Sequence, residues 1–283
     1  MIAGLSSALP SLMKQQSLGR RDCMMATAGL KPSGRKFDLE VTRDPATILA
    51  AQRLRYQVFA EEMGAALPET ELRIDRDDID SHCSHLVVRA RQSGEIAAYT
   101  RLISQPQANR IGQFYSAGEF DLDPVLRLRG RFLEIGRTCV APPFRGGIAL
   151  AVLWSGLVSH CRQEQVDYLI GCASVPPQAD GYPVQALEHQ LTASQRAPLN
   201  LHVRPRQAVP PHLHSVRLDA PMPPLLAAYL RFGAQVCGAP CWDREFNVMD
   251  VFILLDLKRV NQRYERHFFG QPRSQPSAAV AVG

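Results

Sequence analysis

The stretch Glu134-Ile-Gly-Arg-Thr-Cys-Val-Ala-Pro-Pro-Phe-Arg-Gly-Gly-Ile-Ala, residues 134–149, decides the fold. It begins inside an apolar run that starts at Phe132 and is typical of a buried strand. Two prolines and two glycines interrupt the run, and a helix follows whose apolar face carries Leu150, Leu153, Trp154, Leu157 and Cys161. The pattern predicts a strand, a glycine turn and a helix start whose free N–H groups suit a phosphate. An ordinary tight βα turn would contain the same glycines.

The flanking segments extend this unit into a mixed sheet. Upstream, an alternating strand at 37–42 precedes a helix that starts at Asp44-Pro45 and keeps an apolar face to Phe59. The runs 85–90 and 96–103, joined at Ser93-Gly94, predict a hairpin. Downstream we expect strands at 167–174 and 248–255 and helices near 184–195 and 223–232. This order predicts an α/β (α+β) fold with a βαβ unit at the centre of the sheet.

Composition predicts one soluble domain in a reducing compartment. We expect a single domain over residues 37–271, between disordered tails at 1–36 and 272–283. The longest weakly polar run, 147–159, is shorter than the ~20 residues of a membrane span, and residues 1–30 lack the apolar block of a secretory signal. The seven cysteines are odd in number and scattered, which favours the cytoplasm over an oxidising compartment.

The positive charge is concentrated at the N-terminal end. The chain has a formal net charge of +5, and residues 1–36 carry six cationic side chains against Asp22 alone, so the remainder is formally neutral. An acidic partner must therefore bind a local patch. One candidate is the basic segment 258–273, which contains Phe268-Phe269; docking to an acidic carrier or to the inner membrane surface is the alternative to a solvated face. No aromatic-basic motif points to nucleic acid.

Two charged residues in the central strand predict a distortion of it. Glu134 and Arg137 are three positions apart, so a regular strand would direct them to opposite faces. If both serve one site, the strand must bulge between them, and Gly136 is the residue that would permit it. A surface ion pair is the alternative, although the strand otherwise has the composition of a buried one.

The segment Val140-Ala-Pro-Pro-Phe-Arg-Gly resembles the acyl-CoA loop of the GNAT acetyltransferases. The resemblance implies a GNAT-like mixed, mostly antiparallel twisted sheet with a central bulged strand and flanking helices. In that family the bulge presents an N–H to the thioester carbonyl, an interaction that can supply roughly 3–4 kcal/mol in the transition state. The implied ligand is a phosphopantetheine-linked acyl thioester. The shortened glycine run favours the single phosphate of a carrier protein's arm, and the implied arm-binding residues are Val140, Arg145, Gly146 and Gly147.

A second resemblance covers about residues 50–269. Segments such as Asp80-Ser-His-Cys-Ser-His-Leu, Phe114-Tyr-Ser-Ala-Gly-Glu-Phe-Asp-Leu and Trp242-Asp-Arg-Glu-Phe resemble the bacterial ornithine-lipid acyltransferases, and the charged residues resemble those of acyl-homoserine-lactone synthases. The resemblance implies transfer of a 3-hydroxy fatty acyl group from acyl carrier protein to the α-amine of ornithine. The product would be lyso-ornithine lipid, formed by direct aminolysis without a bound cofactor, a metal or a covalent enzyme intermediate.

This chemistry assigns roles to the charged residues. We expect Arg101 or Arg137 to bind the substrate carboxylate with two parallel hydrogen bonds. An acidic residue should hold the side-chain ammonium of ornithine, and Glu134 is the predicted base for the α-amine, directly or through water. Arg137 is also predicted to act in catalysis beside Glu134. The predicted substrate-binding residues are Arg55, Asp77, Asp80, Arg101 and Asp243.

Other interpretations stay open at this stage. The enzyme alternatives are another N-acyl amino acid synthase and a signalling-lactone synthase that uses S-adenosylmethionine; a non-catalytic acyl-carrier-binding module is the alternative from a different class. His82, Cys83 and His85 suggest zinc, but no fourth ligand is evident. Cys139 is either a nucleophile or a small buried residue, and no histidine signal supports the first.

Overall fold

The computed structural model of the 283-residue chain describes residues 36–67 and 71–260, all of which belong to one compact unit. Its elements include β1 (Phe37–Thr42), α1 (Pro45–Tyr56), β2 (Ser84–Ala90), β3 (Ile96–Ser104), β5 (Phe132–Val140), α4 (Ile148–Gln163), β6 (Tyr168–Val175), α6 (Pro224–Phe232) and β10 (Val248–Asp256). The predicted end of the domain at residue 271, the predicted tail 272–283 and all but residue 36 of the predicted tail 1–36 lie outside the described ranges.

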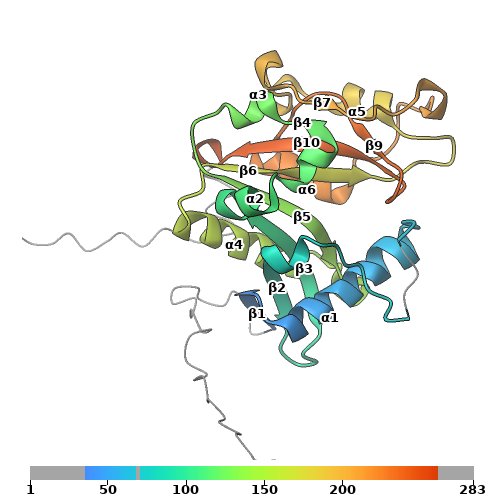
Figure 1. Ribbon diagram of the computed structural model, residues 1–283. Coiled ribbons are helices and arrows are strands. Elements are labelled where there is room, and N and C mark those ends of the chain that lie inside the picture. The colour runs from blue at the N-terminus through green and yellow to red at the C-terminus, as the bar shows by residue number, and fades with distance from the viewer. Residues whose placement is uncertain (1–35, 68–70, 261–283) are drawn as a thin grey trace, which may run out of the picture. The chain divides into compact units, whose positions relative to one another are not determined.

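Among the described residues, eight strands form one sheet in the order β1-β2-β3-β5-β6-β10-β8, with β9 (Cys241–Asp243) also paired to β10 (Figure 1). Every neighbouring pair is antiparallel except β5 and β6, which are parallel and joined by α4. The predicted mixed, mostly antiparallel sheet with a βαβ unit at its centre is therefore confirmed. Strand β8 (Gln235–Val236) closes one edge, and β4 (Phe120–Asp121) and β7 (Arg204–Pro205) form a separate pair.

Apolar side chains alternate along the strands and bury both faces of the sheet. On one face Leu86 and Val88 of β2 pack with α4, α6 and α5 (Val184–Gln190). On the other, Val87 packs against α1, and the residues of β5, β6 and β10 that face this side contact α2 (Gln105–Ile111) and α3 (Asp123–Leu126) (Figure 1). Three layers result, with the sheet in the middle.

Two predicted helices end earlier than expected. Helix α1 ends at Tyr56 and continues as a π-helical turn over Gln57–Glu62, and α5 stops at Gln190. A separate 3₁₀ turn at Ala193–Gln195 follows α5 because Thr192 begins a new capping box with Gln195. Helix α2 was not predicted, although Pro106 and the Ser104–Gln107 capping box mark its start. Within the described residues, no helix has the length and apolar character needed to cross a membrane.

Candidate active site

The central parallel strands separate partway along their length. β5 and β6 are paired only from Phe132–Tyr168 to Glu134–Ile170, and beyond Glu134 they diverge. A cavity of about 740 Å³ occupies this opening. Residues 136–140 of β5 form one wall, and Cys172 and Ser174 of β6 belong to the opposite side. The cavity thus lies where the two strands diverge.

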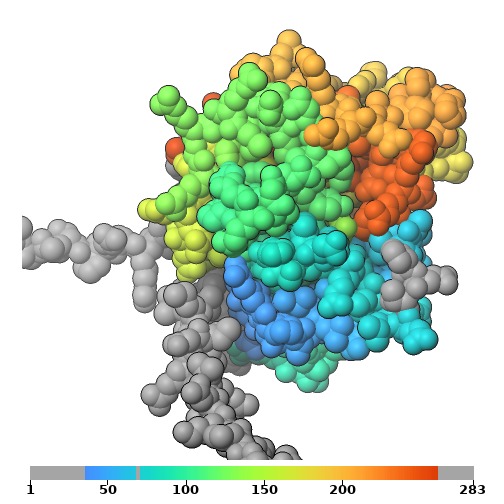
Figure 2. Space-filling model, in the orientation of Figure 1, coloured from blue at the N-terminus to red at the C-terminus, as the bar shows by residue number. Residues whose placement is uncertain are grey.

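Much of the remaining cavity wall is apolar. Val58 and Phe59 come from the π-helical turn after α1, Leu150 from α4, and a proline-rich segment, 221–225, leads into α6. Phe59 stacks edge-on against Phe246, with the ring centroids 5.8 Å apart. Figure 2 shows blue and cyan residues of the N-terminal part of the chain beside orange residues of the C-terminal part. A long apolar wall suits a fatty acyl chain.

Strand β5 carries the predicted bulge, at a different residue than expected. Tyr99 of β3 faces Cys139, but Arg101 faces Gly136, so β5 has one residue more than β3 in this interval. The residue with left-handed backbone is Arg137, with φ 53°, and Gly136 has no positive φ, so the assignment of the distortion to Gly136 was wrong. In this register Arg137 and Thr138 have no paired Cα on β3 or β6, as expected at a bulge, and the Thr138 hydroxyl lies 2.7 Å from that of Thr100.

The bulge brings Arg137 into the cavity wall. Its Nε lies 3.2 Å from Asp75 Oδ2, and its guanidinium stacks 4.9 Å from the ring centroid of Tyr115 and 4.3 Å from that of Phe246. Nη1 donates to Tyr115 Oη at 3.1 Å. Only 11% of the side chain is exposed. Arg137 is thus a rigidly held cation at the cavity surface, as a carboxylate-binding residue requires.

The other predicted substrate-binding cations lie behind the cavity. Arg55 is fully buried and pairs with Asp75 at 2.9 Å and Asp80 at 2.7 Å. Arg101 pairs with Asp80 at 2.8 Å and also with Asp77. Burial opposes ionisation of Asp80, but the two guanidinium groups hold its pKa well below the usual range. None of Arg55, Arg101, Asp77 or Asp80 belongs to the cavity wall, so this network supports Arg137 rather than touching a ligand there.

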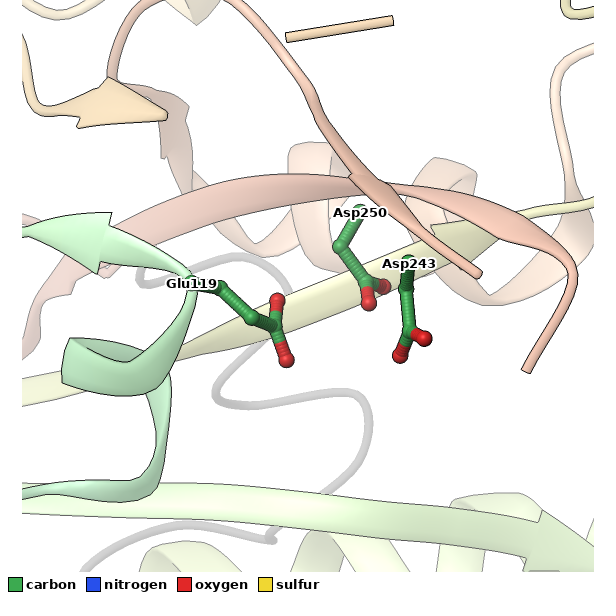
Figure 3. Close-up of side chains that lie close together, drawn as sticks. All are labelled: Glu119, Asp243 and Asp250. Atoms are coloured by element: carbon green, nitrogen blue, oxygen red, sulfur yellow. The ribbon is translucent and has the colours of Figure 1, made fainter. Parts of the chain in front are cut away.

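Three carboxylates meet at the cavity surface from segments far apart in the sequence. The side chains of Glu119, Asp243 and Asp250 point toward one another (Figure 3). One carboxylate oxygen from each residue lies within 4.8 Å of one from each of the other two. We call these three residues the acidic cluster. Asp243 was predicted as a site residue, whereas Glu119 and Asp250 were missed. Glu119 lies in the segment 114–122 that carries the family resemblance, but Asp250 lies in a strand whose other residues are those of a buried core. Among the described residues, these three are the only acidic side chains that line the cavity.

The surroundings of the acidic cluster favour a protonated carboxyl group within it. Burial, together with the neighbouring carboxylates Asp250 and Asp243, raises the pKa of Glu119 to about 9. Burial also raises the pKa of Asp250 to about 6, while Ser174 Oγ donates to its Oδ1 at 2.7 Å. The raised pKa of Glu119 favours its protonated form, and a proton on Glu119 would reduce the repulsion from Asp250. Such a group attracts a cation, because binding a positive charge relieves the repulsion among carboxylates; an ammonium or a hard divalent ion has this chemistry.

The predicted base, Glu134, lies outside the cavity wall. It is 1% exposed, and its carboxylate accepts hydrogen bonds from the backbone N–H groups of Tyr115, at 2.6 Å, and Ser116, at 2.7 Å. The hydroxyl of Ser116 donates a third. The bulge places Glu134 and Arg137 on the same side of the sheet, since both contact Tyr115.

Most of the predicted arm-binding residues border the cavity. Val140, Arg145 and Gly147 line it, whereas Gly146 lines a second cavity of about 700 Å³. Arg145 donates to Val140 O at 3.1 Å and pairs with Glu62 at 2.6 Å. Gly147 adopts φ 89° and caps α4, whose first turn carries no acidic residue, so the helix N-terminus is open to a phosphate.

The sequence features that suggested metal or nucleophile chemistry have structural roles. The ring of His85 is buried, with Nδ1 2.8 Å from Tyr99 Oη and Nε2 3.0 Å from Asp80 O. Among the described residues, the acidic cluster is the one group with metal-ligand proximity, and it contains neither His82 nor Cys83. Burial raises the pKa of Cys139 to about 12, which disfavours a thiolate nucleophile. Residues 263, 266, 268, 269 and 273 of the basic segment lie outside the described ranges.

Comparison with known proteins identifies the class. Residues 54–155 match the acetyltransferase (GNAT) domain family. The CoA-dependent acyl-homoserine lactone synthase BjaI, solved with SAM and isopentyl-CoA, gives a TM-score of 0.51 at 13% identity, over 84% of this chain and 91% of that one. The acyl-homoserine-lactone synthase LasI gives 0.50 at 11% identity, over 86% and 99%. The fold is that of the acetyltransferase (GNAT) domain family.

Curated relatives narrow this class. The L-ornithine N(alpha)-acyltransferase of Rhodobacter capsulatus is 36% identical over 251 residues, which cover 82% of this chain and 94% of that protein. The protein of the same name from Brucella abortus is 34% identical over 264 residues, covering 83% and 90%. The chain belongs to the L-ornithine N(alpha)-acyltransferase family.

Proposed function

We propose that the protein transfers a 3-hydroxy fatty acyl group from acyl carrier protein to the α-amine of L-ornithine, the first step of ornithine lipid synthesis. One observation carries the proposal: the cavity between the separated strands β5 and β6 has a cation, Arg137, an acidic cluster and a long apolar wall. A free amino acid with a cationic side chain and a fatty acyl thioester match these three features. The names of the relatives point to the same acceptor.

The donor enters on the side of α4. Val140, Arg145 and Gly147 border the cavity where β5 ends and α4 begins. The open helix N-terminus and Arg145 favour the phosphate of a phosphopantetheine arm. The arm would then run along residues 136–140, with its acyl chain against the apolar wall. No bound cofactor is needed, because the thioester is already activated.

The acceptor is held at its two charged ends. Arg137 binds the α-carboxylate with its guanidinium, which Asp75, Tyr115 and Phe246 hold in place. The acidic cluster binds the side-chain ammonium, and Asp243 supplies the cluster's third carboxylate beside the Glu119–Asp250 pair. This arrangement leaves the α-amine between the two ends, facing the bulge.

Acyl transfer follows from this placement. The α-ammonium loses one proton to a carboxylate of the acidic cluster, directly or through water, and the free amine attacks the thioester carbon. Backbone N–H groups at the bulge stabilise the oxyanion, an interaction worth roughly 3–4 kcal/mol. The C–S bond then breaks, and the second proton of the nitrogen ends on the departing thiol. The products are the N-acyl amino acid and the free carrier thiol.

A donor panel tests the proposal. Purified protein is incubated with ornithine and 3-hydroxyacyl carrier protein, the matched 3-hydroxyacyl-CoA or acetyl-CoA, and the products are measured by mass spectrometry. We expect lyso-ornithine lipid from the carrier-bound donor, and an Arg145→Ala variant should raise the KM for that donor relative to an Arg110→Ala control on α2. Acylation from acetyl-CoA alone would refute the donor, and no acylation of ornithine by any of the three donors would refute the acceptor.

A further inference from the structure

The carboxylate of Glu134 is occupied by one short segment of the chain. It accepts the N–H groups of Tyr115 and Ser116 and the hydroxyl of Ser116, all within the 3₁₀ turn Tyr115–Gly118. Burial raises the pKa of Glu134, whereas these three donors and the charge of Arg101 oppose the rise by stabilising the ionised form. Three donors on one buried carboxylate make a strong and directional anchor.

The anchored turn carries two residues of the cavity wall. The ring of Tyr115 lies between two guanidinium groups, 5.2 Å from Arg101 Cζ and 4.9 Å from Arg137 Cζ. Glu119 follows the turn directly and projects toward Asp250 (Figure 3). The same turn therefore sets the position of the arginine's aromatic support and of one member of the acidic cluster.

The geometry also separates Glu134 from the proton that a base must remove. A general base has to come within hydrogen-bond reach of that proton, directly or through one water. Glu134 does not line the cavity, and its oxygens already accept three hydrogen bonds. Opening a path to it would break the anchor of the turn.

We propose that Glu134 is a positioning residue: its carboxylate fixes the 115–119 turn so that Tyr115 and Glu119 stand correctly in the substrate cavity. The proposal rests on the proposed acylation of ornithine at this cavity and replaces the role as base that the sequence suggested. In this role Glu134 acts on the substrate only through Tyr115 and Glu119.

A double-mutant cycle between Glu134 and Ser116 tests this role. Glu134→Gln turns an NH₂ group toward donors of the turn, so we expect kcat/KM for ornithine to fall about tenfold, mostly through KM, as when a charge-assisted hydrogen bond is lost. Ser116→Ala should act in the same direction with a smaller effect. The double variant should be no worse than Glu134→Gln, because both changes break one contact.

The pH profile separates the two roles of Glu134. The acidic limb of kcat/KM against pH should persist in Glu134→Gln, since the acidic cluster is intact. Loss of the acidic limb in Glu134→Gln with an unchanged KM for ornithine would overturn the proposal. A double variant whose loss of kcat/KM equals the product of the two single losses would overturn it as well. If Glu134→Gln fails to fold, the test rests on Ser116→Ala alone, and an unchanged KM for ornithine in that variant contradicts the positioning role. A wild-type protein that does not acylate ornithine at all would contradict the proposed function instead.

Discussion

At the scale of single residues, the charged side chains divide into those that face the cavity and those that support them. Arg137 and the acidic cluster line the cavity, while Arg55, Arg101, Asp77 and Asp80 form ion pairs behind it. The sequence identified Arg137 and Asp243 but could not separate the two groups. Which side of a wall a charged residue occupies depends on the strand register and the bulge, and neither can be read from residue spacing alone.

Glu119 is expected to lower the stability of the folded protein, although it belongs to the cluster that binds the substrate's ammonium. Its pKa is about 9 in the folded protein against an ordinary 4.5, so the folded state binds more protons between these values and stability falls as pH rises through them. Glu119→Gln removes this penalty. We expect its melting temperature to exceed that of the wild type by a few degrees at pH 8 and to differ little at pH 4.5, measured by differential scanning calorimetry. An equal shift at both pH values would exclude the raised pKa as the cause.

Arg137→Lys tests the carboxylate contact. Lysine keeps the charge but loses the planar fork and the stacking on Tyr115 and Phe246. We expect kcat/KM for ornithine to fall roughly tenfold or more, chiefly through a higher KM, in steady-state kinetics. The decarboxylated analogue of ornithine should lose this dependence, because it has no carboxylate to bind. The same loss with both acceptors would assign Arg137 to another step.

At the scale of elements, the decisive feature is the separation of β5 from β6. The strand–turn–helix–strand pattern around residues 132–174 was predictable, because long periodic segments carry a clear signal. The presence of the bulge was predictable, because a charged pair on a buried strand implied it. The residue was not predictable, because Arg137 rather than Gly136 adopts the left-handed conformation. Its ion pair with Asp75 and its two aromatic contacts stabilise that conformation, and these come from distant parts of the chain. Short elements such as β8 and β9 have too few residues to show a period.

Two glycines provide a matched test of this junction. A Cβ at Gly171 of β6 would overlap the carbonyl oxygen of Ile135 on β5, whereas a Cβ at Gly136 would meet no atom within 4 Å. We expect Gly171→Ala to destabilise the protein by about 2 kcal/mol or more and Gly136→Ala to change stability by less than about 0.5 kcal/mol, measured by urea unfolding. Similar losses in both variants would argue against close approach at Gly171.

At the scale of the whole molecule, a buried ion-pair network ties the first half of the domain together. Arg55 of α1 and Arg101 of β3 both pair with Asp80, and Asp75 connects Arg55 to Arg137 of β5. The network therefore joins the sheet, the first helix and the 75–80 segment. The resemblance to acyl-homoserine-lactone synthases indicated that these charges belong together, but their structural role depends on contacts between segments that are distant in the sequence.

Asp80→Asn should expose the importance of this network. It leaves two buried guanidinium groups with too little negative charge, a situation that costs about 3–5 kcal/mol. Asp219→Asn is the control, because its ion pair with Arg217 is 72% exposed on the aspartate side and should contribute less than about 1 kcal/mol. Chemical denaturation of both variants at pH 7 measures the difference. Equal and small losses would mean that the buried pairs do not stabilise the fold.

The most direct test of the central claim compares two acceptors that differ only in the side-chain amine. Ornithine and norvaline have the same carbon skeleton, so the ratio of their kcat/KM values measures recognition of that ammonium. We predict a strong preference for ornithine in the wild type and a loss of at least about tenfold of that preference in Asp243→Asn. An undiminished preference for ornithine in Asp243→Asn would contradict the claim that the acidic cluster in the β5–β6 cavity reads the substrate.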